Sequence, residues 1–207
     1  MKNNNDEVTP ETSTLSFFQS EEWKEISIDL IKTYIGEDRH YHGLFHIMDT
    51  LVIAESLKPD NELAVYLTMW FHDVVYDATK SDNEELSAAF AKEKLSGKVD
   101  ESVVDFVVNA ILLTKHKEVD HRTASTKGKD YQIVLDSDLF GLATSKYKEN
   151  SEKIRKEYSH VSNEDWKKGR SQFLKSMLER EKIYHLLDSK FEELAKKNMR
   201  EELESLS

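Results

Sequence analysis

The chain has 207 residues, a formal net charge of −11 and no cysteine, which excludes disulfide bonds and thiol catalysis. The acidic balance argues against a nucleic-acid-binding surface, because neutralising phosphates requires a basic face. With 38% hydrophobic residues but only 6 glycines and 2 prolines, the composition favours a helix-rich domain, since few residues break helices.

The start of the chain, residues 1–14, is polar, and we expect it to be a frayed tail. Residues 15–207 are expected to form one domain. The first residues lack the apolar centre of a signal peptide, and no apolar run approaches the roughly 20 residues of a membrane span. The expectation is therefore a cytoplasmic protein without a membrane partner.

Apolar residues recur at helical spacing in the first half of the chain. Trp23, Leu30 and Tyr34 share one face of a first helix, which Gly36 ends. The segment 63–75 is apolar nearly all round, which predicts a helix buried on every side. Further helices are expected at about 44–51, 81–95 and 103–113.

The second half of the chain begins with a polar, aperiodic segment, residues 117–130, which predicts a loop. Residues 133–142 then form a short apolar helix interrupted by two aspartates. Amphipathic segments near 144–160, 163–181 and 183–204 complete the pattern. We therefore predict an all-α fold of about eight helices in a single domain.

Histidines are concentrated in RHYHGLFHI, residues 39–47. His42 and His46 are four residues apart and share a face if the segment is helical. The zinc-protease motif HExxH has this spacing, but Gly43 stands where its glutamate would be, so we reject that interpretation. For His42, simple packing is the alternative. His46 has an apolar residue on each side, and a buried imidazole without a partner costs roughly 1–3 kcal/mol.

Carboxylates in apolar surroundings are the second unusual feature. His72 and Asp73 follow the segment that is apolar on all faces, where a carboxylate needs an arginine, a protonated histidine or a metal ion as its partner. A structural His–Asp hydrogen bond is the alternative. In VLDSDLFGL, Asp136 and Asp138 interrupt an apolar run, so that one can cap a helix or face water while the other needs a cation.

Three separate segments thus supply groups able to bind a metal ion: His46, then His72 with Asp73, then Asp138. Two imidazoles and two carboxylates suit one divalent transition metal ion and leave coordination positions for water and substrate. This ligand set does not distinguish manganese, iron, zinc, nickel and magnesium.

The order of these residues resembles the HD superfamily of metal-dependent phosphohydrolases. LFHIMDTL resembles the first-histidine helix of that superfamily, FHDVVYD its His-Asp signature and DSDLFGLA its final aspartate helix. More narrowly, R-x-Y-H-x-x-x-H, F-H-D-x-V-Y-D, N-E-x-x-S and L-D-x-D-L are similar to a predicted HD phosphohydrolase subgroup without a defined substrate. The likeness extends over roughly residues 23–200.

The resemblance implies an HD-domain bundle in which His46, His72, Asp73 and Asp138 bind the metal ion. His42 competes for the first ligand position, and the match of LFHIMDTL favours His46. Asp136 competes for the last position, and the apolar pair that follows Asp138 favours the latter.

The activity that the resemblance implies is hydrolysis of a small phosphate ester or nucleotide by metal-activated water. Asp77, Glu84 and His116 are the candidate acids and bases, although Glu84 could instead cap a helix. FHDVVYDATKSDNEEL also resembles the hydrolases of guanosine tetraphosphate, but Tyr76 replaces the glutamate assigned to water activation there, which argues against that activity. Candidate substrate contacts, unless they are solvated surface, are Arg39, His42, Lys115, Arg155, Tyr158 and Arg170.

Two other functions remain open. Some HD-fold relatives are mixed-metal or di-iron oxygenases, which need two further histidine ligands, and only His116 and His121 lie in the relevant interval. The chain could also be an inactive metal-binding or nucleotide-binding module. The number of metal ions per chain would distinguish an oxygenase, which holds two, from a phosphohydrolase with one. Nucleotides that bind but are never turned over would identify an inactive module. The sequence leaves open whether two copies form a homodimer.

Overall fold

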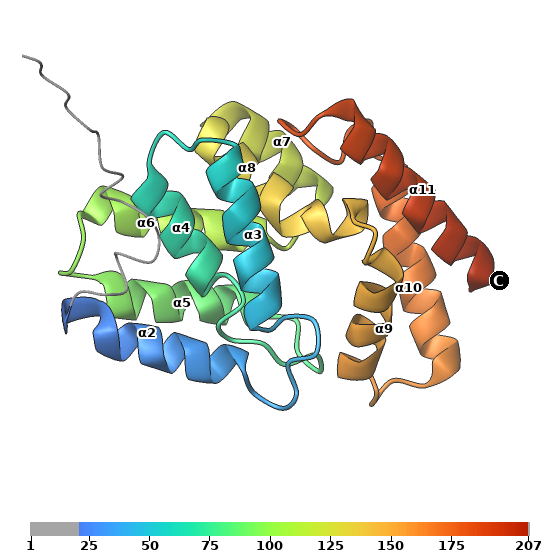
Figure 1. The fold of residues 1–207 in the computed structure, drawn as a ribbon, viewed down its shortest axis with the longest axis horizontal. Coiled ribbons are helices and arrows are strands. Elements are labelled where there is room, and N and C mark those ends of the chain that lie inside the picture. Colours follow the sequence, from blue (N-terminus) through green and yellow to red (C-terminus); the bar gives the residue numbers. More distant parts are fainter. Residues whose placement is uncertain (1–20, 207) are drawn as a thin grey trace, which may run out of the picture.

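The computed structural model describes residues 21–206, and over this range the protein is all-helical, which confirms the predicted fold class (Figure 1). The described part contains ten α-helices and one 3-10 helix, somewhat more than the eight expected. The predicted tail, residues 1–14, lies outside the described residues. In chain order the elements are α2 (Glu21–Tyr34), α3 (Leu44–Ser56), α4 (Glu62–Phe71), α5 (Asn83–Leu95), α6 (Glu101–Leu113), α7 (Glu118–Lys127), α8 (Lys129–Asp138), η1 (Leu139–Ala143), α9 (Tyr147–Glu157), α10 (Asn163–Leu178) and α11 (Ser189–Ser205).

The helices pack around two main hydrophobic clusters. The first joins α2 to α6 with the middle of α8, and the second joins η1 with α9, α10 and α11. Figure 1 shows α2, α4, α5 and α6 on one side of the molecule and α9 to α11 on the other, with α3 and α8 between them. The end of α8 and η1 therefore lie where the two clusters meet.

Helix α4 is the most deeply buried element of the first cluster. Its N-terminus is capped by Asn61, whose side chain accepts a hydrogen bond from the backbone N–H of Ala64. Every residue from Ala64 to Phe71 is buried, as the apolar pattern predicts. The helix ends at Phe71 rather than at residue 75, so His72 and Asp73 lie at its C-terminal end, directly after the core.

Two local predictions were wrong. Residues predicted as a loop, 117–130, contain α7, because one face of this polar helix buries Ala124 against Leu113 and Leu135. Tertiary packing of a single small residue leaves little apolar periodicity in the sequence. The last helix begins at Ser189 rather than near residue 183, because Asp188 caps it and the preceding residues use their backbone N–H groups elsewhere.

None of the helices in residues 21–206 is both long enough and apolar enough to cross a membrane.

Candidate metal centre

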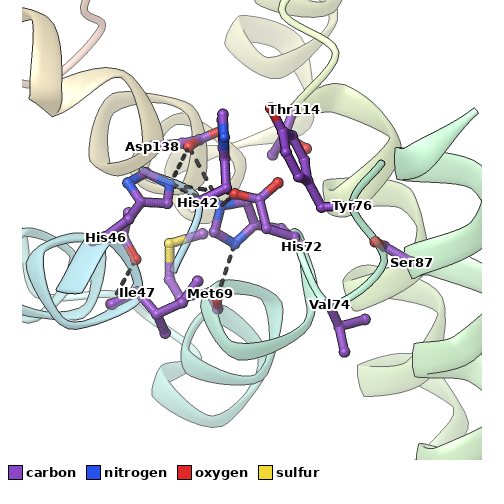
Figure 2. Close-up of polar contacts among 12 residues, drawn as sticks. His42, His46, Ile47, Met69, His72, Val74, Tyr76, Ser87, Thr114 and Asp138 are labelled. Carbon is purple, nitrogen blue, oxygen red and sulfur yellow. Dashed lines mark hydrogen bonds and ion pairs between the residues drawn. The ribbon is translucent and has the colours of Figure 1, made fainter. Parts of the chain in front are cut away.

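Three helices bring their ends together around a small group of polar side chains. His46 lies in the first turn of α3, His72 follows α4, and Asp138 is the last residue of α8. Figure 2 shows these three side chains pointing toward one another. The chain enters α3 through Gly43, where a Cβ atom would lie 3.0 Å from two backbone carbonyl oxygens, a close approach that favours glycine.

The spacing of the three side chains suits a metal ion. His46 Nε2 is 3.3 Å from His72 Nε2 and 3.1 Å from Asp138 Oδ1. His72 Nε2 is 3.4 Å from the same carboxylate oxygen. Neighbouring ligand atoms of an ion bound at about 2.0–2.2 Å lie about 2.8–3.6 Å apart. His46, His72 and Asp138 could therefore hold a metal ion with little rearrangement.

Asp73 lies at the edge of this group. Its Oδ2 atom is 3.1 Å from His72 Nε2 and 3.5 Å from His46 Nε2. Although these contacts are short, the oxygen is buried and makes no well-directed hydrogen bond within the described residues. Burying a carboxylate oxygen in that way costs free energy, and a cation between the two imidazoles would compensate it. The chemistry of the donor set thus fits a metal ion with Asp73 as an additional ligand.

The imidazole of His72 is oriented by the helix that precedes it. Its Nδ1 atom lies 2.8 Å from the carbonyl oxygen of Met69, which can only accept, so Nδ1 carries a hydrogen. This leaves Nε2 facing the carboxylate of Asp138 as the atom available to a metal ion. Such backbone partners fix the orientation of histidine ligands in metal sites.

His116 contacts the same carboxylate through its other oxygen. Its Nε2 is 2.7 Å from Asp138 Oδ2. The backbone of His116 has φ of 52°, in the left-handed region, which costs of order 1–3 kcal/mol for a residue with a side chain. A hydrogen bond from Arg180 to the carbonyl oxygen of His116 helps to hold this conformation. Strain of this kind is typical of residues held in place for function.

The imidazoles and carboxylates of the centre shift each other's pKa values. Burial disfavours protonation of His46, but its hydrogen bond with Asp138 and the nearby charges of Asp138 and Asp73 outweigh this effect and raise the pKa of His46 to about 9. Burial also lowers the pKa of His72, but the same two carboxylates have the larger effect and raise this pKa well above its usual value. Burial opposes ionisation of both carboxyl groups, but the nearby charge of His72 lowers the pKa of each well below its usual range. A metal ion entering the centre must replace those protons.

Asp136 does not belong to this cluster. It is 0% exposed, and its carboxylate accepts backbone N–H groups of His185 at 2.8 Å, Leu186 at 2.7 Å and Leu187 at 3.0 Å. Burial raises the pKa of Asp136 and these hydrogen bonds oppose the rise. The expectation that one of the two aspartates caps a helix or faces water was wrong, because Asp136 is buried and its partners are three backbone amides. Asp138 is the aspartate that reaches the cluster.

Glu157 is a buried carboxylate that the sequence analysis did not identify. It accepts the backbone N–H groups of Tyr41 at 2.7 Å and His42 at 2.9 Å. It also lies 2.7 Å from His42 Nδ1 and accepts the hydroxyl of Tyr76 at 3.1 Å. The His42 ring stacks on Tyr76 with centroids 4.2 Å apart. Glu157 therefore fixes the orientation of His42, but its place on an amphipathic helix gave no sign of this role.

A cleft of about 530 Å³ opens onto the centre, and Asp73 and Asp138 are among its lining residues. We call it the substrate cleft because of the function proposed below. Residues of α9 and α10 form much of its remaining wall. Its size is within the range of pockets that hold small organic ligands.

Only two of the three residues expected to act as acid or base lie in the cleft. His116 and Glu84 line the substrate cleft, whereas Asp77 is not among the lining residues. Asp77 instead accepts hydrogen bonds from the backbone N–H and hydroxyl of Thr79. Glu84 does not cap α5, which has no side-chain cap, and its carboxylate is 3.6 Å from the ammonium of Lys115.

The cations expected to contact substrate already have partners. Arg39 and Arg155 donate to backbone carbonyl oxygens, and Lys115 pairs with Glu85 at 2.7 Å. These three residues are not among those that line the substrate cleft. The expected substrate contacts that do line it are His42, Tyr158 and Arg170.

No family model matches the sequence, and the comparisons with curated proteins and with solved structures find no match either. The HD resemblance thus rests on the sequence motifs alone.

Proposed function

We propose that the protein is a metal-dependent phosphohydrolase of the HD type that acts on a small phosphate ester. The observation that carries the proposal is the spacing of 3.1–3.4 Å among donors of His46, His72 and Asp138, which come from three separate helices. His46, His72 and Asp138 would hold a divalent cation, which would supply Lewis acidity for activating water and for offsetting charge on phosphoryl oxygens. Asp73 supplies a further carboxylate at the edge of the group.

The protein's own residues would handle protons and position the ester. His116 lines the substrate cleft and has Nε2 on Asp138, so it can receive or return a proton beside the centre. His42, whose Nδ1 contacts Glu157, also lines the cleft and is a second candidate for proton transfer. Glu84 is a further carboxylate in the same cleft. Its carboxylate lies 3.6 Å from the ammonium of Lys115 and is the candidate base.

Elemental analysis of the purified protein, followed by a phosphate-release screen over phosphate esters, tests this proposal. We expect about one metal ion per chain and phosphate release that a chelator abolishes. Asp73→Ala should lose both metal and activity, whereas the exposed His160→Ala should keep both. Full metal occupancy in Asp73→Ala would reject the ligand assignment. Metal without phosphate release from any ester, but with nucleotide binding, would favour the inactive-module alternative.

A second candidate, a two-metal oxygenase of the HD type, is favoured by one specific observation. His121 is 7% exposed, and neither of its ring nitrogens has a hydrogen-bond partner within the described residues. Its ring lies 5.7 Å from that of His116. Two metal ions per chain, with the second lost in His121→Ala and the first retained, would support this candidate. A single ion that His121→Ala leaves in place would exclude it.

A further inference from the structure

Resting on the proposed function, we propose that the substrate cleft selects esters with one phosphate on an uncharged, aromatic or apolar group, and disfavours polyphosphates. The inference follows from the residues that line the cleft beyond the metal centre. These residues would contact the organic group of the ester and any further phosphates on it, rather than the phosphate that reacts.

The cleft has no uncommitted cation for a second phosphate. Arg170 is the one lysine or arginine among its described lining residues. Its Nε and Nη2 atoms donate to the two carboxylate oxygens of Glu202, each at 3.0 Å. Such a fork of two parallel hydrogen bonds neutralises the guanidinium and uses its most favourable directions. Arg170 is also buried, so it cannot swing toward a ligand without removing the cationic partner of the Glu202 carboxylate.

Apart from His42 and His116, to which proton transfer is assigned, the remaining charged side chains on the wall are acidic. Glu84 and Asp165 line the cleft, and Asp165 lies in the first turn of α10. Glu84 has Lys115 nearby, but that ammonium is closer to Glu85, at 2.7 Å, and lies outside the cleft lining. A second or third phosphate would therefore approach carboxylates without meeting a positive partner. Like charges in a partly enclosed cleft repel, which weakens binding.

Aromatic rings are frequent on the part of the wall that α9 and α10 form. Tyr147, Tyr158, Trp166 and Phe173 all come from α9, α10 or the turn between them. The rings of Tyr158 and Trp166 lie 5.5 Å apart at an angle of 44°. Aromatic side chains bury large apolar areas and stack on planar groups. This wall therefore suits an aromatic or apolar group attached to the reacting phosphate.

Paired ligands test the two halves of this inference on the full-length protein with Mn²⁺ held at a fixed free concentration. Phenyl phosphate is compared with glycerol phosphate to vary the organic group, and adenosine 5′-monophosphate with adenosine 5′-diphosphate to vary the phosphates. We expect kcat/KM to be at least tenfold higher for the phenyl ester and at least tenfold higher for the monophosphate. Equal or reversed ratios would overturn the inference while leaving phosphate release, and hence the proposed function, intact.

Binding of phenylphosphonate, measured by calorimetry, gives a readout that does not depend on turnover. Trp166→Leu should weaken it at least fivefold, whereas Trp166→Phe, which keeps a ring, should retain most of the affinity. Metal content and thermal unfolding check that each variant is folded and loaded. Tyr158→Leu serves as a second variant should Trp166→Leu fail to fold. Unchanged phenylphosphonate affinity in a folded leucine variant would overturn the aromatic subsite, and absence of phosphate release from every ester would instead reject the proposed function.

Discussion

Metal binding at the centre should depend steeply on pH, because the metal-free protein holds protons where the ion would bind. Against the effect of burial, Asp138 and Asp73 raise the pKa of His46 to about 9, and the same carboxylates raise that of His72. At pH 7 we therefore expect the imidazole of His46 to be protonated in the absence of metal. A metal ion must displace at least the proton of His46 before its Nε2 atom can become a ligand.

The size of this effect follows from the pKa. One pH unit below the pKa corresponds to about 1.36 kcal/mol, so displacing the His46 proton at pH 7 costs about 3 kcal/mol, or roughly a factor of 100 in apparent affinity. We expect the apparent dissociation constant to fall about tenfold per pH unit between pH 7 and 9. The dependence will be steeper where His72 loses its proton in the same step.

Calorimetry in two buffers with different ionisation enthalpies counts the protons that each bound ion releases. We expect one to two protons at pH 7, and the same number in the exposed control variant His160→Gln. Affinity that is constant from pH 7 to 9, with no proton release, would refute the reasoning. Stability of the chelated protein offers a parallel check: because the folded pKa of His46 exceeds its unfolded value near 6.5, its contribution is complete below pH 6.5 and lost as pH rises through 9.

Three substitutions test other features of the structure. Asp136→Asn should lower the free energy of unfolding by about 2–4 kcal/mol in urea titrations, because an amide cannot accept all three backbone N–H groups; a loss below about 0.5 kcal/mol would contradict this. Glu157→Gln should lower kcat about tenfold with unchanged metal content, since His42 loses a charged partner; loss of metal would show a different role. Gly141→Ala places a Cβ atom 2.3 Å from the hydroxyl oxygen of Tyr41 and should cost about 1–3 kcal/mol, and Tyr41→Phe should recover part of that loss in a double-mutant cycle.

The helical pattern and the unusual polar residues in apolar segments were enough to predict the fold class and to select the side chains that meet. His46, His72 and Asp138 stood out because imidazoles and carboxylates in apolar runs need partners. The choice between Asp136 and Asp138 could not be made on that ground. The partners of Asp136 are backbone amides about 50 residues later in the chain, and a backbone amide has no signature in the sequence.

Long cationic side chains were the least predictable part of the site. Arg39 and Arg155 were expected at the substrate, yet both hold loops together through carbonyl oxygens. Their choice of partner depends on which loops fold back beside them, and amino-acid type alone does not encode that. The sequence analysis did not identify Glu157, because a glutamate on an amphipathic helix is usually solvated. Its partners, the backbone N–H groups of Tyr41 and His42, lie more than 100 residues earlier in the chain.

The two hydrophobic clusters support different parts of the site: one positions the candidate metal donors, and the other positions the aromatic wall of the cleft. The donor atoms belong to α3, α4 and α8, whereas the aromatic wall belongs to α9 and α10, which are anchored in their own cluster. For the function proposed above, substitutions in that wall would therefore alter which esters bind while the metal donors stay in place. Directed-evolution libraries confined to residues 147–173 would exploit this separation.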